Sequence, residues 1–183
     1  MDNYENSLVE QGRRERVERS TFYKLSQVVS RPFLRLLFRH ESHGLENIPD
    51  ENGAVVATNH ASNLDPPLVG ADVDRPLFTM AKQSLHETPV LGTLIRGLYS
   101  FPVRRGVLDT TALRTAVTLL EHDNLVLMFP EGTRTTDGQL QEPRPGVGKI
   151  VAEAEVPVVP GYVKGSYDAW PKGQPVPKPR STS

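Results

Sequence analysis

The sequence predicts an α/β domain with a mostly parallel central sheet, flanked by helices on both faces and preceded by an N-terminal amphipathic helical segment. The main observation is that short apolar runs alternate with segments of helical periodicity between residues 54 and 163. The second is size, because 183 residues, 37% of them hydrophobic, suffice for one buried core but not comfortably for two. We therefore expect one folded domain over residues 41–170.

Composition excludes several classes of function. The net charge is −1, so no global attraction to nucleic acid is expected and any anion site must be local. The chain has no cysteine, which excludes disulfides, thiolate nucleophiles and thiolate metal sites. The first 20 residues do not resemble a secretory signal, and no apolar run approaches the roughly 18 residues that span a bilayer. We expect a cytoplasmic protein, in solution or peripheral to a membrane.

The N-terminal part divides into two segments. Residues 1–20 are polar and mixed in charge, which predicts a frayed or poorly ordered lead-in. Residues 21–39 form an amphipathic pattern at about 100° per residue, and Pro32 inside it favours two short helices over one long helix. The apolar stripe comprises Phe22, Leu25, Val29, Phe33, Leu36 and Leu37, and the basic face comprises Lys24, Arg31, Arg35 and Arg39. The stripe can either pack on the domain or dock on anionic lipid, and the sequence leaves both hypotheses open.

After the turn-rich connector GLENIPDENG, strands and helices are expected in alternation. The predicted strands are 54–58, 77–80, 98–103, 125–129 and 156–163. The predicted helices begin near Pro66, at Thr88–Pro89 (ending near Gly97), at Asp109 (ending at His122) and at Gly146. The proline-rich tail 171–183 is not expected to form a central strand.

Three apolar runs of the predicted sheet end in polar clusters. The run at 54–58 leads into NHASNLD, the run at 98–103 into RRG, and the run at 125–129 into EGTR. In an open parallel sheet, ligands bind outside the carboxyl ends of the strands. We therefore expect the polar side chains at these ends to meet on one edge of the sheet. They are His60, Arg104, Arg105, Glu131 and Arg134.

His60 and Asp65 are candidates for a general base and the carboxylate that orients it. A neutral imidazole can take a proton from a hydroxyl, and a partner carboxylate fixes its tautomer and stabilises the imidazolium. Each residue also has a structural interpretation. A lone histidine is more often a surface or core residue, and an aspartate before Pro66 is a favourable helix N-cap.

The arginine clusters are candidates for an anion site. Arg104 and Arg105, followed by Gly106, suit phosphate because a guanidinium offers a bidentate fork, although such a pair is more often a solvated rim. The EGTR segment adds backbone N–H groups directly after a strand. Glu131 in such a site would either accept a hydrogen bond from a substrate hydroxyl or orient an arginine, and we favour the second role.

Four motifs occur in order and at characteristic spacing: NHASNLDP, FPVRRG, FPEGTR and VPVVPGYVKG. Together they resemble the motifs of the glycerolipid acyltransferases of the 1-acylglycerol-3-phosphate acyltransferase (PlsC) family, over roughly residues 35–170. The resemblance implies transfer of a fatty acyl group from acyl-CoA or acyl carrier protein to the free hydroxyl of a lysophospholipid phosphate, at a membrane surface and without nucleic acid, metal or cofactor. It implies His60 and Asp65 as the catalytic dyad. It implies acceptor binding by Arg104, Arg105, Glu131, Gly132, Thr133 and Arg134, and more loosely a structural or acyl-donor role for the fourth motif.

The resemblance has one departure. The family usually continues into further strands after the fourth motif, whereas this chain continues only into the proline-rich tail, so it is expected to be either naturally short or truncated.

Direct attack by the acceptor hydroxyl fits this chemistry, since a thiolate leaves easily and the chain has no G-x-S-x-G elbow. Two alternatives stay open: a hydrolase or thioesterase using Ser62 as nucleophile, and a lipid-binding protein without activity. A metal site is the weakest alternative, because the remaining histidines show no ligand spacing with His60 or Asp65. They are His40, His43, His86 and His122.

Overall fold

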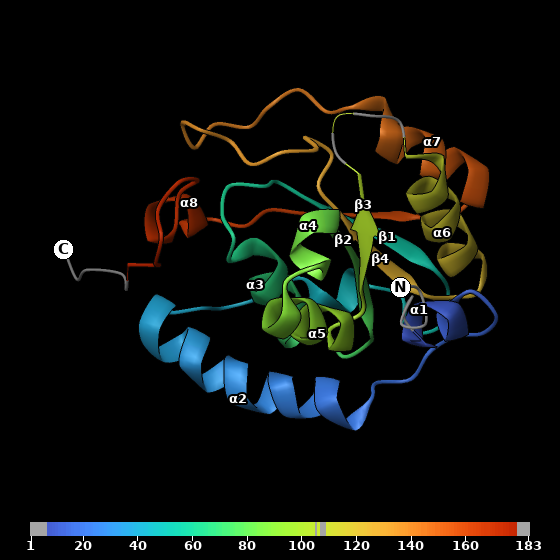
Figure 1. Ribbon diagram of the computed structural model, residues 1–183, viewed down its shortest axis with the longest axis horizontal. Coiled ribbons are helices and arrows are strands. Elements are labelled where there is room, and N and C mark those ends of the chain that lie inside the picture. Colours follow the sequence, from blue (N-terminus) through green and yellow to red (C-terminus); the bar gives the residue numbers. More distant parts are fainter. Residues whose placement is uncertain (1–6, 105, 107–108, 179–183) are drawn as a thin grey trace.

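The structure, a computed structural model, describes residues 7–104, 106 and 109–178. Within this part of the chain, five parallel strands form one sheet in the order β3-β2-β4-β1-β5 (Figure 1). The strands are β1 (Ala54–Thr58), β2 (Leu77–Lys82), β3 (Ser100–Val103), β4 (Leu125–Met128) and β5 (Val158–Gly161). The predicted α/β class with a parallel sheet is confirmed.

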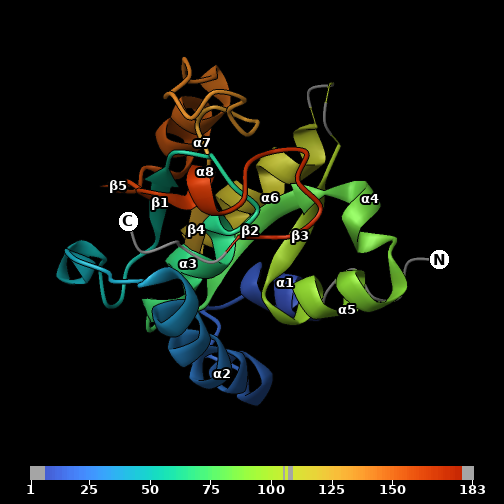
Figure 2. The same ribbon diagram turned by 90° about the vertical axis from the view of Figure 1, so that its left-hand side faces the viewer.

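Helices cover both faces of this sheet (Figure 1, Figure 2). The helices of the described residues are α1 (Ser7–Gly12), α2 (Thr21–Phe38), α3 (Asp65–Asp72), α4 (Gln83–His86), α5 (Pro89–Gly97), α6 (Thr110–Glu121), α7 (Pro145–Ala154) and α8 (Ser166–Ala169), with a 3₁₀ turn at Leu45–Asn47. Residues of α6 and α7 pack on one face, in a cluster that includes Val55 of β1 and Val126 of β4. On the other face, Val56 of β1 packs with residues of and after α3. Burial of both faces explains why β1 and β4 are continuous apolar runs.

Two predicted helix starts are confirmed by the structure. Asp109 precedes α6 and accepts a hydrogen bond from the backbone N–H of Ala112 at 3.2 Å, as a helix N-cap does. Thr88 precedes α5, whose first residue is Pro89, although the Thr88 side chain makes no capping bond. The sequence therefore predicts these two starts to within a residue, and a side-chain cap forms at Asp109 but not at Thr88.

Residues 7–20 differ from the frayed lead-in that their composition predicted. Residues 7–12 form α1, and the side chains of Val9 and Val17 are buried in the main core. Asn124 accepts from the backbone N–H of Val17 at 2.9 Å and donates to the carbonyl of Gly12 at 2.9 Å. Two apolar side chains and one buried amide are enough to order a segment whose average composition is polar. Residues 1–6 lie outside the described part.

α2 is one continuous helix, so the expectation of two short helices was wrong. Pro32 removes the hydrogen bond to the carbonyl of Val28, one turn earlier. Both residues are exposed, so water can satisfy this carbonyl and the helix continues. At its start, Ser20 accepts from the backbone N–H of Tyr23 at 3.1 Å.

The apolar stripe predicted for α2 faces away from the domain for most of its length. Five of its six residues are exposed, namely Phe22, Leu25, Val29, Phe33 and Leu36, the last to 82%, and Leu37 is half-buried. Val28, which was not part of the predicted stripe, is exposed as well. The side of α2 that contacts the domain is formed by Tyr23, Gln27 and Leu34. In both views α2 lies along the outer, lower side of the molecule (Figure 1, Figure 2). The hypothesis that the stripe simply packs on the domain is therefore wrong.

Hydrogen bonds connect α2 to the second half of α3 and to the residue directly after it. Gln27 donates to the carbonyls of Gly70 and Val73, at 2.9 and 2.8 Å. Arg31 donates to the carbonyl of Ala71 at 2.7 Å. Among the described residues, neither α2 nor any other helix is both long and apolar enough to cross a membrane.

The proline-rich tail is described as far as residue 178, and over 171–178 it forms turns rather than a strand, as predicted. The backbone N–H of Lys178 donates to the carbonyl of Ala169 at 2.7 Å, and the Trp170 indole donates to the carbonyl of Gln174 at 2.8 Å. The tail therefore folds back onto α8.

Candidate active site

His60 and Asp65 form a buried pair at the carboxyl edge of the sheet. The chain leaves β1 at Thr58, turns, and enters α3 at Asp65, which brings the two side chains together. His60 Nδ1 lies 2.9 Å from Asp65 Oδ2, and the residues are 7% and 0% exposed. With Nδ1 directed at the carboxylate, Nε2 is the ring nitrogen that can exchange a proton with a substrate.

Asp65 holds the turn as well as the ring. Its Oδ2 atom also accepts from the backbone N–H groups of Ala61 and Ser62, each at 2.7 Å. Asp65 is the first residue of α3, the N-cap position belongs to Leu64, and no side chain caps the helix, so the N-cap interpretation was wrong. Three donors on one oxygen fix the carboxylate before any substrate arrives.

The third motif surrounds the other side of His60. Phe129, directly after β4, stacks on the imidazole with ring centroids 3.9 Å apart and an interplanar angle of 18°. Glu131 accepts from the backbone N–H of His60 at 2.8 Å, and the backbone N–H of Thr135 donates to the His60 carbonyl at 2.9 Å. β1 and β4 are neighbours in the sheet, which brings these distant segments together.

Among the described residues, Glu131 bonds no arginine, in contrast to the orienting role that the sequence favoured. It is 5% exposed, and its second carboxylate oxygen accepts from Gln141 at 3.1 Å. Its bonds therefore go to the His60 peptide and to the loop that follows the motif. The sequence does not reveal that the partner of Glu131 is the backbone N–H of His60, because this group belongs to a distant segment.

Arg104 lies just past the end of β3, at the same edge of the sheet, with an exposed side chain. Its backbone N–H and Nε both donate to Asp109 Oδ2, at 2.8 and 3.3 Å. Burial raises the pKa of Asp109, but the hydrogen bonds from Arg104 and Ala112 outweigh burial and hold this pKa below its ordinary value. Arg105, predicted beside Arg104, lies outside the described residues.

The remaining residues of the third motif form the turn after β4. The backbone N–H of Gly132 donates to the carbonyl of Phe129 at 2.9 Å, and Gly132 has φ 68°, a conformation that favours glycine. Thr133 and Arg134 follow and are half-buried. The structure therefore brings His60, Asp65 and Glu131 into direct contact, and puts Arg104 and Arg134 on the same edge without a bond to them.

The sequence analysis missed two cations at this edge. Lys82 is the exposed last residue of β2, which lies between β3 and β4, so it stands between Arg104 and the third motif. The predicted strand ended at Met80, and extending it by two residues would have found Lys82. Arg144 lies over Gly132, where a Cβ atom would come within 2.8 Å of its Cδ. Only the fold reveals this second contact, because twelve positions separate the two residues.

Ser62 is fully buried, and its hydroxyl already has partners. It donates to the carbonyl of Trp170 at 2.8 Å and accepts from the backbone N–H of Leu64 at 3.1 Å. The second bond is the turn-capping contact expected of a serine here. An activated nucleophile would instead be exposed and bonded to a base, so the geometry disfavours a serine hydrolase.

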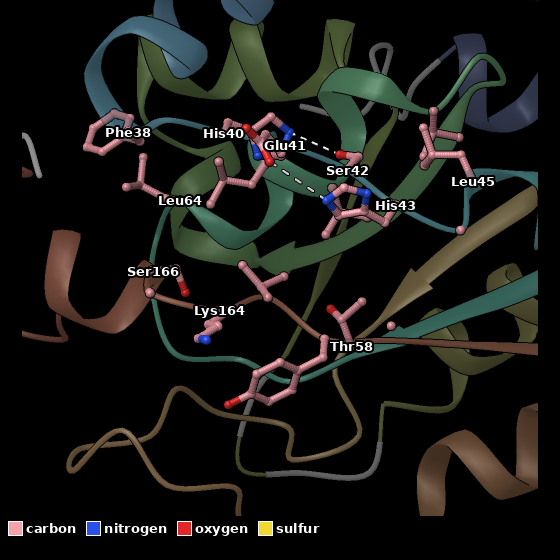
Figure 3. A pocket seen from close by; sticks show the side chains of 18 of the residues that line it. Phe38, His40, Glu41, Ser42, His43, Leu45, Thr58, Leu64, Lys164 and Ser166 are labelled. Carbon is pink, nitrogen blue, oxygen red and sulfur yellow. Dashed lines mark hydrogen bonds and ion pairs between the residues drawn. The ribbon is translucent and has the colours of Figure 1, made fainter.

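A cavity of about 720 Å³ lies beside the turn of residues 59–65, which carries His60 and Asp65, and is lined by β1, β5, α3 and the connector between α2 and β1 (Figure 3). Thr58 and Leu64, which flank His60 in the chain, line it, and so do apolar residues of α3 such as Leu68 and Val69. The hydroxyls of Thr58 and Ser166 in its wall are buried and have no hydrogen-bond partner among the described residues. The lining is mixed, because charged residues such as Arg39, Glu41 and Lys164 line the cavity together with the apolar ones. Ligand pockets combine apolar walls with polar groups in this way.

The other histidines have separate local partners. His40 pairs with Asp72 at 3.0 Å, and the His122 ring nitrogen Nδ1 lies 2.9 Å from the Thr118 carbonyl. Across the described part of the chain, no three histidine or carboxylate side chains are arranged to hold a metal ion.

The fold and site define an α/β protein with a buried His–Asp pair at the carboxyl edge of a parallel sheet, suited to general-base chemistry beside a row of cations. A family profile described as Acyltransferase matches residues 39–164, which is more than half of the chain. The chain belongs to this acyltransferase family.

Named relatives agree with the assignment. The chain is 30% identical over 122 residues to the 1-acyl-sn-glycerol-3-phosphate acyltransferase of Bacillus subtilis (strain 168), covering 66% of this chain and 60% of that protein. It is 30% identical over 131 residues to the enzyme of the same name from Limnanthes douglasii, covering 68% and 47%. The crystal structure of the 1-acyl-sn-glycerophosphate (LPA) acyltransferase PlsC from Thermotoga maritima superposes with a TM-score of 0.70 at 29% identity, covering 86% of this chain and 63% of that one. The chain thus spans about half to three fifths of these relatives.

Proposed function

We propose that the protein transfers a fatty acyl group from an acyl thioester, acyl-CoA or acyl carrier protein, to the free hydroxyl of 1-acylglycerol-3-phosphate, which gives phosphatidic acid. The observation that carries the proposal is the buried His60–Asp65 pair, with Nδ1 and Oδ2 2.9 Å apart, at the cationic edge of the sheet. Membership of the acyltransferase family and the names of its relatives support the substrates.

The residues support a single displacement without an acyl-enzyme. Nε2 of His60 takes the proton of the acceptor hydroxyl while the hydroxyl oxygen attacks the thioester carbonyl and forms the new C–O bond. The tetrahedral intermediate collapses, the C–S bond breaks and the thiolate leaves. The imidazolium, stabilised by Asp65, returns its proton to the thiolate sulfur, which regenerates neutral His60.

The cations at the edge suit the phosphate of the acceptor. Arg104 and Arg134 lie after β3 and β4, and Lys82 ends the strand between them. Neighbouring strands are about 4.8 Å apart, so these side chains can converge on one phosphate group. The family pattern adds Arg105, Gly132 and Thr133 to the acceptor site.

The outward apolar stripe of α2 suits docking on a membrane, where the lipid acceptor resides. Six apolar side chains are exposed along α2, and Lys24 and Arg39 at its two ends are exposed as well. An apolar face with flanking cations is the pattern of a helix that lies in the surface of an anionic bilayer. We place the protein on the cytoplasmic face of the cell membrane.

The cavity beside the catalytic turn suits an acyl chain, because its wall carries Leu64, Leu68 and Val69. Thr58 in its wall is two residues from His60 in the sequence, so the cavity lies next to the segment that carries the imidazole. Its volume of about 720 Å³ lies within the usual range of ligand pockets.

One assay tests the proposal. A panel of lysophospholipid and lysophosphatidate acceptors is incubated with acyl-CoA and acyl carrier protein donors of several chain lengths, and thioester loss and ester formation are measured together. We expect turnover with a lysophosphatidate acceptor that His60→Ala abolishes while circular dichroism stays unchanged. Turnover with another lysolipid alone would show that the proposed acceptor is wrong. No transfer to any lysolipid would contradict the acyltransferase activity and favour a lipid-binding protein.

A further inference from the structure

The peptide of His60 is held from both sides by one segment. Glu131 accepts from its N–H at 2.8 Å, and Thr135 donates to its carbonyl at 2.9 Å. Pairing of β1 with β5 ends at Thr58 and Gly161, so the N–H of His60 lies beyond the sheet ladder. A buried N–H without an acceptor is costly, and here a carboxylate provides the acceptor.

The surroundings of Glu131 suit a structural partner better than a substrate. The side chain is 5% exposed, and both carboxylate oxygens already accept from the protein, one from His60 and the other from Gln141. A hydrogen bond from an N–H to a buried carboxylate is about twice as strong as one between neutral groups. Glu131 therefore ties the carboxyl end of β4 firmly to the catalytic turn after β1.

We infer that Glu131 is a positioning residue for His60, rather than a contact for the acceptor as the family pattern suggests. It fixes the His60 peptide, and the peptide fixes the imidazole between Asp65 and Phe129. Only with the ring in this place does Nε2 face the edge of the sheet where the hydroxyl must arrive. Misplacement by about 1 Å can cost about 100-fold in rate, so loss of the bond acts on turnover and not on binding.

The kinetic test compares Glu131→Ala and Glu131→Gln with Glu142→Gln, an exposed carboxylate of the same loop. Glutamine keeps one oxygen that can accept from the His60 N–H, so we expect kcat to fall about 100-fold in E131A and less than about 10-fold in E131Q. The KM values for acceptor and donor should change less than about threefold, and E142Q should match the wild type. A rise in acceptor KM with kcat retained would assign Glu131 to the substrate and overturn the inference.

A second measurement needs no turnover. The kinetic test rests on the proposed function, because it needs acyl transfer. Amide hydrogen exchange does not, so it can test the role of Glu131 even if the proposed function is wrong. In E131A, amide hydrogen exchange at His60 should accelerate by about 100-fold, while exchange at Val56 in β1 stays slow, and E131Q should restore protection at His60. Unchanged protection of the His60 amide in E131A would overturn the inference. If E131A does not fold, E131Q decides, because a substrate contact predicts a raised acceptor KM and positioning predicts none.

Discussion

The hydroxyl of Ser62 donates to the carbonyl of Trp170 across 108 positions of sequence, at 2.8 Å. This bond ties the turn of residues 59–65 to Trp170, directly after α8, so the hydroxyl is already bonded to the backbone. The sequence position of Ser62, two residues after His60, allows a nucleophile. Its contacts in the fold are those of a structural residue.

Ser62→Ala is therefore expected to retain acyl transfer. Its kcat should stay within about threefold of the wild type, while the free energy of unfolding falls by about 1–3 kcal/mol, because the carbonyl of Trp170 and the N–H of Leu64 lose a buried partner. Chemical denaturation and steady-state kinetics measure the two effects. An acyl-enzyme seen by mass spectrometry in the wild type and absent from S62A would support the serine hydrolase instead.

Phosphate recognition by Arg134 can be separated from donor binding. If Arg134 binds the acceptor phosphate, Arg134→Ala should raise the acceptor KM about 10- to 100-fold and leave the donor KM nearly unchanged. Arg114, exposed on α6, offers a matched control in R114A, which should change neither KM. An equal rise in both KM values of R134A would argue against a phosphate contact. Arg104→Ala should behave like R134A.

The sequence predicted the parallel sheet and the His60–Asp65 pair because both depend on local signals: apolar runs, cap residues and polar clusters at strand ends. It did not predict which bonds Glu131 makes, because its partners are a backbone N–H 71 positions away and Gln141 on the following loop. The orientation of α2 was also open, since periodicity defines an apolar face but not what covers it. Its polar attachment through Gln27 to two carbonyls is a tertiary feature that no pattern encodes.

The exposed stripe of α2 makes a direct prediction for membrane binding. Leu25→Glu combined with Phe33→Glu should weaken binding to vesicles of phosphatidylglycerol and phosphatidylethanolamine by about 10-fold or more, because both side chains would lie in the apolar layer. Both are exposed, so thermal stability should change little. Val176→Glu, at an exposed position of the tail, serves as the control in the same sedimentation assay. Unchanged binding of the double variant would move the membrane contact elsewhere.

Ionisation of Tyr23, which lies on the side of α2 that contacts the domain, is expected to lower the stability of the protein at alkaline pH. Burial raises the pKa of its hydroxyl from 10.0 to about 12. The neutral hydroxyl of Tyr23 is thus favoured in the folded state. Its contribution to the free energy of unfolding is complete below pH 10, the unfolded pKa, and is lost as the pH rises through 12, the folded pKa. The loss should reach about 2 kcal/mol near pH 12. Urea denaturation of the wild type and of Tyr23→Phe should therefore converge on the alkaline side, and parallel stability curves would contradict the assignment.

The charge of Asp65 can be tested separately from its shape. Oδ2 accepts from the imidazole and from two backbone N–H groups, and Oδ1 is buried without a partner among the described residues. Asp65→Asn can keep one oxygen for these donors, but it removes the charge that stabilises the imidazolium and buries an amide NH₂ in place of Oδ1. We expect kcat to fall by about 10⁴-fold with both KM values within about threefold, as for an Asp→Asn change behind a catalytic histidine, where the amide also favours the wrong tautomer of the ring. The same variant should also unfold more easily, by about 1–3 kcal/mol, because the new donor is unsatisfied. If D65N retained kcat within about 10-fold, Asp65 would only shape the turn, and His60 would act without a charged partner.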